Sequence, residues 1–583
     1  MDYIGLISII MVYDVLSEEQ IQTQNLQHLG LVAAAIDKIN LTNKIDVRLP
    51  LTDNKGYKVT MGQRVAAMIL NGLGFMDDRL YMFPEFLEDK PVRRLFGENV
   101  KAEHFNDDAL GRCLDSIHRY GETKLFAEIA FEIGTEQKIL GKTARFDTTS
   151  LSVYGDYREE ESIVSSKQDS TEKTKGKTNS VETETTEDPF NITYGYSKDG
   201  RPDLKQMILN LATTGKANLP IWMEAHSGNA SDKVILEQAA ARMKKFAAAL
   251  KEAPSFLFVG DSAMYDACVG KAGDMLWLSR VSHTNKQSKE VLDQKEQDLI
   301  WQECDNGYRI SPIKSSYKGV EQRWLLVYSK QKYESEIITL NKRIKAEEAS
   351  MTKKLWHLSN EVFTCEKDAQ KALKKLTKEL KYHKTISSVE KVHQHSNKGR
   401  PKKGAIADIV GHKAIASLTL DDEQLTRHHL KLGRFVLATN QLDKEQLSDD
   451  GMLFEYKEQM HTESGFRFIK GDTFEVASIF LKKPTRVSAL MMVMTLCLMV
   501  YNLAQHMLRE SLKAHNAAIP DQLQKPTQKP SMERVCKLFR SVHIVIIAYD
   551  DHYQELVSNL TDVLRQIIRY YGSMAEKIYG LSA

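Results

Sequence analysis

Residues 143–154 read TARFDTTSLSVY, and the sequence changes there from a helical to a strand-like pattern. The segment is rich in β-branched and aromatic residues, which favour a strand. Asp147 interrupts it with a charged side chain of a type that strands normally avoid. Because a carboxylate in a buried strand is costly unless something compensates its charge, Asp147 is the first candidate for a functional residue.

Strand and helix patterns alternate after this segment. Further strand patterns occur at residues 192–196, 221–225, 256–259 and 275–282, and a helical pattern covers 232–251. Such alternation predicts an α/β core with a sheet at its centre. Residues 158–190 are rich in Ser, Thr, Lys and Glu and contain few large apolar side chains, so we expect a disordered loop there.

Length and composition bound the architecture and the class of protein. A chain of 583 residues exceeds the roughly 250–300 residues at which single cores stop growing. With 42% hydrophobic and 27% charged residues, it is neither fibrous nor wholly disordered. Lys and Arg number 80 against 78 Asp and Glu, so any basic surface for nucleic acid must be local. Six scattered cysteines without a C-x-x-C pair predict neither a disulfide framework nor a zinc site.

The patterns divide the chain into five regions of an α/β (α+β) multidomain protein. We expect a helical N-terminal domain at 1–135 for DNA binding or assembly, the first part of the core at 136–285, an insertion domain with strands and a helical hairpin at 286–445, the final core helices at 446–515 and a C-terminal helical region at 516–583. The uncharged run 487–505 is as long as a membrane span, but its polar residues favour a buried core helix, and we expect no membrane partner.

The N-terminal helices carry readable start signals. Thr60 and Gln63 fit a capping box, and Asn106 is placed to cap a second helix. Helices of this kind could form a DNA-reading helix-turn-helix or could simply pack together.

Several enzyme classes are excluded by their missing motifs. The sequence contains no G-x-S-x-G, no G-x-x-x-x-G-K-[ST] and no G-x-G-x-x-G after a strand. Acidic residues at strands remain. Asp261 ends the run FLFVGD at 256–261, and with Asp147 it could hold divalent metal ions through oxygen ligands. Each of these residues could instead cap a turn or a helix.

A third acidic position lies in LFEYKEQMHTESGFRFIK, residues 453–470. Tyr456, Gln459, Glu463 and Lys470 follow one another at intervals of three, four and seven residues. On an α-helix these intervals keep all four side chains on one face, which could meet the acidic strand ends.

The order of a strand Asp, a second strand Asp, a long insertion and a helical Glu resembles that of the DDE transposases of bacterial insertion sequences, which have an RNase H-like core. Residues 456–470 are similar to the signature Y-x2-R-x3-E-x6-K of the subgroup whose core is interrupted before the last acid. Residues 145–157, 194–206, 226–233 and 480–484 also look like blocks of this subgroup.

The resemblance implies a DNA transposase, that is, a polynucleotidyl transferase and endonuclease, with Asp147, Asp261 and Glu463 as its metal-binding triad. Two Mg²⁺ ions about 3.5–4 Å apart, which Mn²⁺ is able to replace, would activate a water or a 3′-hydroxyl and stabilise the leaving 3′-oxygen. Such an enzyme binds the terminal inverted repeats of its element, cuts there and joins the ends to target DNA.

The same resemblance suggests DNA contacts around the triad. Lys470 matches the Lys of the signature and Tyr456 matches its Tyr, whereas Gln459 stands in the position of its Arg. A neutral amide lacks the bidentate, charge-assisted phosphate contact of a guanidinium. Arg467, four residues after Glu463, could supply that contact instead.

A basic segment of the insertion is a further candidate for DNA binding. Arg400, Lys402 and Lys403 lie in GRPKK, which looks like the core of a minor-groove AT-hook, although a flexible linker has the same composition. The expected partner is double-stranded DNA, held by a homodimer because joining two ends requires both at once. We expect a cytoplasmic, nucleoid-associated bacterial protein. Two alternatives remain: a metal-dependent nuclease of the same fold that does not join ends, and an inactive DNA-binding relative.

Overall fold

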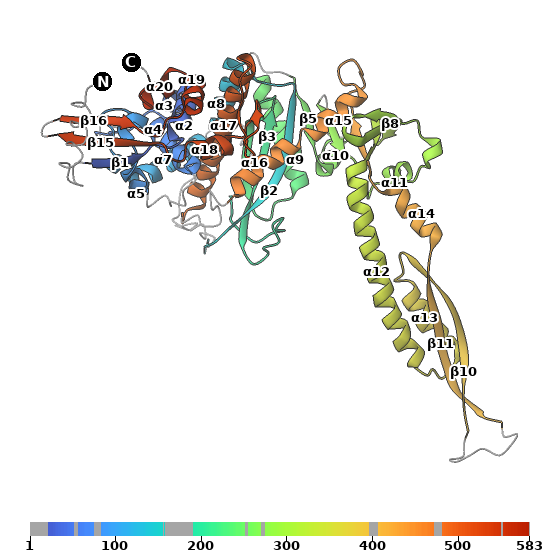
Figure 1. Cartoon of the computed structure of the whole chain (residues 1–583). Helices are drawn as coiled ribbons and strands as arrows, with labels where there is room; N and C mark the ends of the chain where they lie inside the picture. The colour runs from blue at the N-terminus through green and yellow to red at the C-terminus, as the bar shows by residue number, and fades with distance from the viewer. Residues whose placement is uncertain are drawn as a thin grey trace, which may run out of the picture. The chain divides into compact units, whose positions relative to one another are not determined.

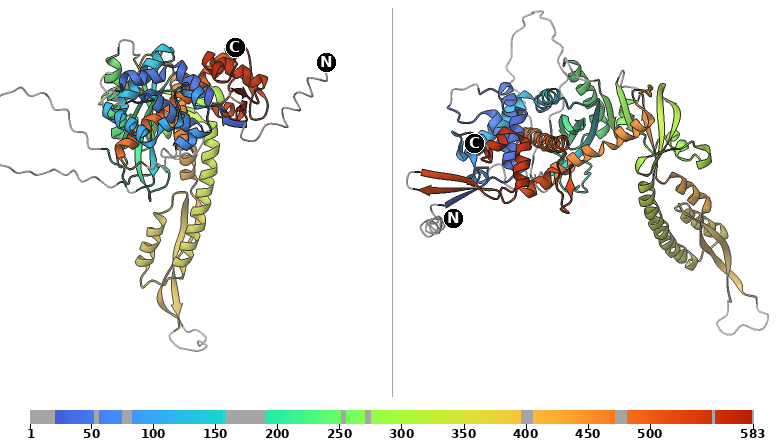
Figure 2. Two further views of the ribbon diagram at one scale, coloured as in Figure 1. Left: turned by 90° about the vertical axis from the view of Figure 1, so that its left-hand side faces the viewer. Right: turned by 45° about the horizontal axis from the view of Figure 1, so that its top comes forward.

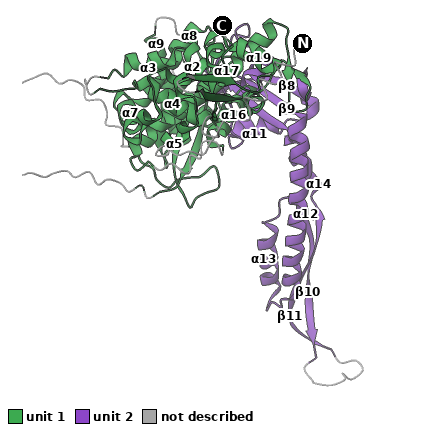
Figure 3. Cartoon of the chain, turned by 60° about the vertical axis from the view of Figure 1, so that its left-hand side comes forward, with its two compact units in different colours: residues 1–276, 457–583 green, residues 277–456 purple. Residues whose placement is uncertain are grey.

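The computed structural model of the chain divides into two compact units (Figure 3). Residues 1–276 and 457–583 form unit 1, and residues 277–456 form unit 2. The structure describes residues 21–51, 56–74, 83–155, 157, 190–250, 255–269, 275–395, 406–471, 481–549 and 552–581. The predicted loop 158–190 therefore lies outside the described residues except at its last position. The five regions predicted from the sequence are distributed over these two units.

In unit 1 the strands follow the order β4-β3-β2-β5, and Figure 1 labels β3, β2 and β5. These strands are β2 (Thr143–Val153), β3 (Lys205–Thr214), β4 (Leu219–Ser227) and β5 (Leu257–Gly260). Strand β2 runs antiparallel to β3 and parallel to β5, and β3 runs antiparallel to β4. This mixed arrangement confirms the predicted fold class and agrees with an RNase H-like core.

Three of the four predicted strands that fall in this unit are confirmed, and the one at 192–196 is wrong. Within that segment Thr193 makes an isolated bridge to Gln206, and the rest forms a loop. A Cβ on Gly195 would lie 1.9 Å from the carbonyl oxygen of Gly228, so the backbone turns closely over the end of β4. Strand β3 was not predicted because its buried run, MILNLATT, lacks the alternation that marks a half-exposed strand.

Four long helices of unit 1 pack on its sheet: α8 (Glu122–Glu136), α9 (Asp232–Ala248), α16 (Met460–Lys470) and α17 (Pro484–Ala514). Among the described residues, α17 is the helix long and apolar enough by length and composition to cross a membrane, with a mean hydropathy of 2.0 in its most apolar window. Because 83% of that window is buried in the protein, the expectation of a core helix is confirmed. The predicted continuous helix over 452–470 is interrupted at residues 458–459, between α15 (Asp449–Lys457) and α16.

The N-terminal region is largely helical, as predicted. Its helices are α2 (Leu29–Lys38), α3 (Leu41–Arg48), α4 (Met61–Leu73), α5 (Phe83–Glu88), α6 (Val92–Phe96), η3 (Ala102–Phe105), α7 (Asp107–Tyr120) and α8 (Glu122–Glu136). The Thr60 and Gln63 capping box forms at the start of α4, and Asn106 caps α7. Helices α2 and α4 are buried along most of their length and pack on α17, which favours the packing alternative over a groove-reading helix.

The C-terminal region was predicted to be helical and contains a β-sheet instead of helix at its centre. Strands β15 (His543–Tyr549) and β16 (His552–Val557) pair with each other, and β15 also pairs with the N-terminal strand β1 (Ile21–Asn25). The run HIVIIAY is β-branched, which explains the strand. The remaining elements are β13 (Ile519–Pro520), β14 (Pro526–Thr527), α18 (Met532–Leu538), α19 (Asp562–Tyr571) and α20 (Ser573–Ile578).

Unit 2 has an antiparallel sheet with the strand order β6-β12-β9-β8-β7. These strands are β6 (Leu276–Arg280), β7 (Gln302–Cys304), β8 (Tyr308–Tyr317), β9 (Val320–Ser329) and β12 (Arg434–Thr439), so the strands predicted in this part of the chain are confirmed. Short helices accompany the sheet: α11 (Lys286–Leu292), η4 (Glu296–Asp298), η5 (Asp305–Gly307), α14 (Asp422–Lys431) and α15.

The predicted helical hairpin of the insertion is also confirmed, as α12 (Lys330–Asn360) and α13 (Glu366–Thr377). Both helices pack along a two-stranded ribbon, β10 (His383–Gln394) and β11 (Asp408–Leu420), which the sequence did not predict (Figures 1 and 2). Their shared core is a small apolar cluster: Met351, Leu355, Leu358, Ala369, Leu373 and Ala414. Arg400, Lys402 and Lys403, which lie between β10 and β11, are outside the described residues.

The capping box of α4 gives a direct test of the N-terminal fold. The Thr60 hydroxyl accepts a hydrogen bond from the Gln63 N–H at 3.1 Å, and the Gln63 side chain accepts one from the Thr60 N–H at 2.9 Å. We expect Thr60→Ala to destabilise the protein by about 1 kcal/mol and to lower its Tm, whereas Thr60→Ser keeps the acceptor and the Tm. Equal thermal unfolding curves for Thr60→Ala and the parent protein would contradict this.

Candidate active site

Asp147 lies in the middle of β2, opposite Leu211 of β3. Its side chain is half-buried, and one carboxylate oxygen accepts a hydrogen bond from the Thr148 N–H at 2.8 Å. Burial raises the pKa of Asp147 to about 7, against the lowering effects of that hydrogen bond and of the Lys198 charge. The negative charges of Asp261 and Glu463 raise this pKa further. The other two predicted acids therefore lie near enough to Asp147 in unit 1 for their charges to act on it.

The parallel pairing of β2 with β5 places Asp261 level with Asp147. Arg145 is the register partner of Val259, and each aspartate stands two residues further along its own strand direction. Adjacent strands lie about 4.8 Å apart, so Asp261, directly after the end of β5, occupies the position next to Asp147 on β2. Asp261 ends β5 and caps α10 (Ser262–Cys268), accepting a hydrogen bond from the Ala263 N–H at 2.9 Å. Asp261 therefore caps a helix, which was the alternative that the sequence left open. It also lies beside Asp147, as the sequence predicts.

Glu463 reaches the same place on α16, which is attached to β2 by polar contacts. The Gln459 amide donates to the Phe146 carbonyl at 3.3 Å, and the Thr462 hydroxyl contacts the Arg145 carbonyl at 3.4 Å. Both carbonyls directly precede Asp147 in the chain. The Thr462 hydroxyl also lies 2.8 Å from that of Thr213 on β3. These contacts set the helix so that the exposed Glu463 stands beside the acidic strand ends.

The donor chemistry of the triad fits Mg²⁺ or Mn²⁺, because both ions prefer carboxylate oxygens. Within the residues that the structure describes, no three His, Cys, Asp or Glu side chains are grouped closely enough to hold one metal ion. The three carboxylates thus lie in one region of unit 1, but they are further apart than the ligands of one bound metal ion would be. Their mutual repulsion, felt at Asp147, is the electrostatic condition that a bound cation would relieve.

Lys198 and Asp199 are functional candidates that were not singled out from the sequence. The Lys198 ammonium donates to the Thr148 carbonyl at 2.8 Å and the Thr148 hydroxyl at 3.0 Å, and pairs with Asp232 at 3.0 Å. These three acceptors match its three N–H donors, so Lys198 is a fixed positive charge next to Asp147. The only signal for these residues was their place in the transposase-like block 194–206.

The structure separates the predicted DNA-contacting residues into different environments. Lys470 forms an ion pair with Asp199 at 2.7 Å, and the exposed Arg467 donates to Ser464 at 3.0 Å. Gln459 is only 6% exposed, so its side chain serves to hold α16 on β2 and offers little to DNA. Tyr456 belongs to unit 2, where its ring packs 6.0 Å from that of Phe435, as expected for a packing residue.

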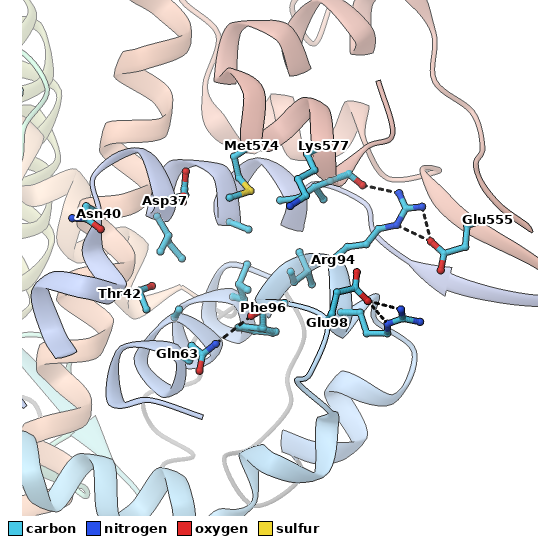
Figure 4. Close-up of a pocket in the computed structure, with 18 of the residues that line it drawn as sticks. Asp37, Asn40, Thr42, Gln63, Arg94, Phe96, Glu98, Glu555, Met574 and Lys577 are labelled. Atoms are coloured by element: carbon cyan, nitrogen blue, oxygen red, sulfur yellow. Dashed lines mark hydrogen bonds and ion pairs between the residues drawn. The ribbon is translucent and has the colours of Figure 1, made fainter. Parts of the chain in front are cut away.

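A cavity of about 710 Å³ lies elsewhere in unit 1, among α2, α4, α6, β16 and α20 (Figure 4). Arg94 spans part of it, donating to Glu555 at 2.6 Å and to the Ile578 carbonyl at 2.9 Å. Asp37, Asn40 and Lys577 also line it. None of the predicted site residues contributes to this cavity, and its main charged groups are paired with each other.

Comparisons with known proteins give the following. Residues 21–131 match a protein family described as a domain of unknown function, DUF4277. No curated protein matches the sequence. Among solved structures, the chain is similar to a piggyBac transposase in a synaptic complex with hairpin DNA, seen by cryo-EM. The two share 9% sequence identity over 90% of this chain and 83% of that one, with a TM-score of 0.34. A likeness this distant carries no argument about activity, so the function rests on the site residues themselves.

The raised pKa of Asp147 predicts that the acidic site destabilises the fold. An aspartate ordinarily titrates at 3.8, and Asp147 in the folded protein does so at about 7. As pH rises between these values the unfolded chain loses its proton first, so stability falls, and above pH 7 the full penalty remains. We expect Asp147→Asn to be more stable than the parent protein at pH 8 in EDTA, by up to about 4 kcal/mol, and equally stable at pH 4.

Thermal unfolding at the two pH values measures this difference. Asp261→Asn is the control, because Asp261 is exposed and asparagine keeps the helix cap, so its Tm should change little. An Asp147→Asn protein that melts below the parent at pH 8 would show that the Asp147 charge is compensated in the fold.

Proposed function

We propose that this protein is a DDE transposase that binds the ends of its own DNA element, cuts them and transfers them to a target. The observation that carries the proposal is the gathering of Asp147, Asp261 and Glu463 in unit 1, where the charges of the other two act on Asp147. Three carboxylates held near one another lower the stability of the fold, so a purely structural role does not account for them. Metal-dependent phosphoryl transfer requires such a set.

The residues of the site divide the work as follows. Asp147, Asp261 and Glu463 would hold Mg²⁺, which when bound activates the attacking oxygen and stabilises the leaving 3′-oxygen at phosphorus. Lys198 keeps a positive charge beside Asp147 and thereby favours its ionised, ligand-competent form. Lys470 and Arg467, on the helix of Glu463, would contact phosphates near the cut, with the phosphate replacing Asp199 as the partner of Lys470.

Two further parts of the proposal concern the partners. The basic segment with Arg400, Lys402 and Lys403 would bind DNA through narrow minor grooves. Joining two element ends to one target requires that both be held at once, so the active form would be a homodimer on double-stranded DNA.

Substitution of the acids tests the chemistry. We expect Asp147→Asn, Asp261→Asn and Glu463→Gln each to reduce Mg²⁺-dependent cleavage of a duplex carrying the DNA that flanks this gene by at least about 10³-fold, because each removes a metal ligand. DNA binding should be retained, since the neutral residues keep the shape of the site. Cleavage is measured on a denaturing gel and binding by electrophoretic mobility shift.

The matched control is Glu458→Gln, which changes a carboxylate two residues before α16 begins and should leave cleavage intact. Cleavage that survives all three triad substitutions would overturn the proposal. Cleavage without joining to a target plasmid would favour the nuclease alternative, and binding without any cut would favour the inactive relative.

Metal binding can be tested without activity. If the three carboxylates bind Mg²⁺, the ion relieves their repulsion and stabilises the folded protein by mass action. We expect millimolar Mg²⁺ to raise the Tm of the parent protein relative to EDTA and to raise that of Asp147→Asn much less. An equal Mg²⁺-induced change in the two proteins would place ion binding away from Asp147.

A further inference from the structure

Two tyrosines stand out from unit 1 on the segment that precedes β3. Tyr194 is 59% exposed and Tyr196 is 88% exposed. Tyrosine usually buries most of its ring, so a pair this exposed indicates a contact with another molecule. Between them, Gly195 brings the backbone against the end of β4.

This loop is firmly attached to the sheet. The buried Gln206 amide donates to the Tyr196 carbonyl at 3.2 Å and to the Gly228 carbonyl at 2.7 Å. Thr193 exchanges both backbone hydrogen bonds with Gln206, and the Lys198 N–H donates to the Ser150 hydroxyl at 3.0 Å. The tyrosines therefore sit on a support that is held at several points, which reduces the entropy that a partner loses in binding them.

The loop also connects the two elements that carry the first and last acids. Lys198 contacts Thr148 on β2, and Asp199 pairs with Lys470 on α16. The loop that carries the tyrosines is therefore joined to both β2 and α16.

The strand register shows where this loop is attached along β2. Asp147 pairs with Leu211, whereas Gln206, which holds Tyr196, pairs with Ser152, five residues further along β2. At about 3.3 Å per residue, Ser152 stands roughly 16 Å from Asp147 along β2, and Gln206, which holds Tyr196, lies opposite Ser152. A duplex rises about 3.4 Å per base pair, so a duplex held at the acids is long enough to reach this part of β2.

We propose that Tyr194 and Tyr196 form a docking platform for duplex DNA, packing against the sugar–phosphate backbone on one side of the scissile phosphate. The inference rests on the proposed function and adds a surface that sets where the DNA lies relative to the acids. The partner is the DNA backbone, because the loop that carries the rings is bonded both to β2 and to α16, the elements of Asp147 and Glu463, so that a duplex held at the acids would pass this loop. Contacts of this kind fix register without reading sequence.

Hydroxyl-radical footprinting of the full-length protein on the flanking-DNA duplex tests the platform, in Ca²⁺ to prevent cutting. The parent protein should protect a patch of sugars outside the cleavage site, on one side of it. The double variant Tyr194→Ala/Tyr196→Ala should lose this protection and keep the rest of the footprint. Its Kd for the duplex should rise roughly tenfold, equal to about 1.4 kcal/mol. Tyr194→Phe/Tyr196→Phe keeps the rings and should retain most of the protection.

Tyr553→Ala is the matched control, since Tyr553 is 58% exposed on β16 and away from the acidic site. Its footprint and Kd should equal those of the parent. An unchanged footprint for the double alanine variant, with parent-like cleavage, would overturn the platform and leave the transposase proposal standing. Absence of binding and cleavage by the parent protein would instead remove the proposed function on which the platform rests.

Discussion

The contact between α16 and β2 is the constraint on which the acidic site depends. Gln459 and Thr462 hydrogen bond to two consecutive carbonyls of β2, those of Phe146 and Arg145. These carbonyls lie immediately before Asp147, so the same contacts that attach the helix also place Glu463. A shift of one turn in the helix would move its side chains by about 5.4 Å and take Glu463 out of range. Polar contacts suit this role because, unlike apolar packing, they are satisfied at one register only.

The site that results is costly for the fold. Burial and neighbouring negative charge both raise the pKa of Asp147, and the fixed ammonium of Lys198 offsets only part of this effect. Groups with perturbed pKa values of this origin are typical of functional sites, because selection for stability alone would remove them. The apolar packing that stabilises unit 1 comes from the long buried helix α17 and from the N-terminal helices that pack on it.

The chain order imposes a second constraint. Asp261 precedes unit 2 in the chain and Glu463 follows it. The acidic site of unit 1 is therefore built from two segments that residues 277–456 separate. Unit 2 has antiparallel strands, and its helices and ribbon enclose an apolar cluster. An insertion with a core of its own can be accommodated between two elements of another core, provided that its ends remain compatible with the host fold.

The sequence by itself determined the strand that carries Asp147, the α/β alternation around it, the caps of α4 and α7, the helical hairpin of the insertion and the buried nature of α17, because each depends on local periodicity or on adjacent residues. The order of its motifs also predicted Asp147, Asp261 and Glu463 as metal ligands. Only the tertiary structure decided that Asp147 and Asp261 are level on parallel strands and that Gln459 faces the interior. It also decided that Lys198 lies beside Asp147, that Asp199 pairs with Lys470, and that Tyr194 and Tyr196 are exposed. The strands β3, β10, β11 and β15 were likewise missed, since pairing partners far apart in the chain stabilise them. Register and burial are properties of such long-range pairings, and no window of neighbouring residues contains them.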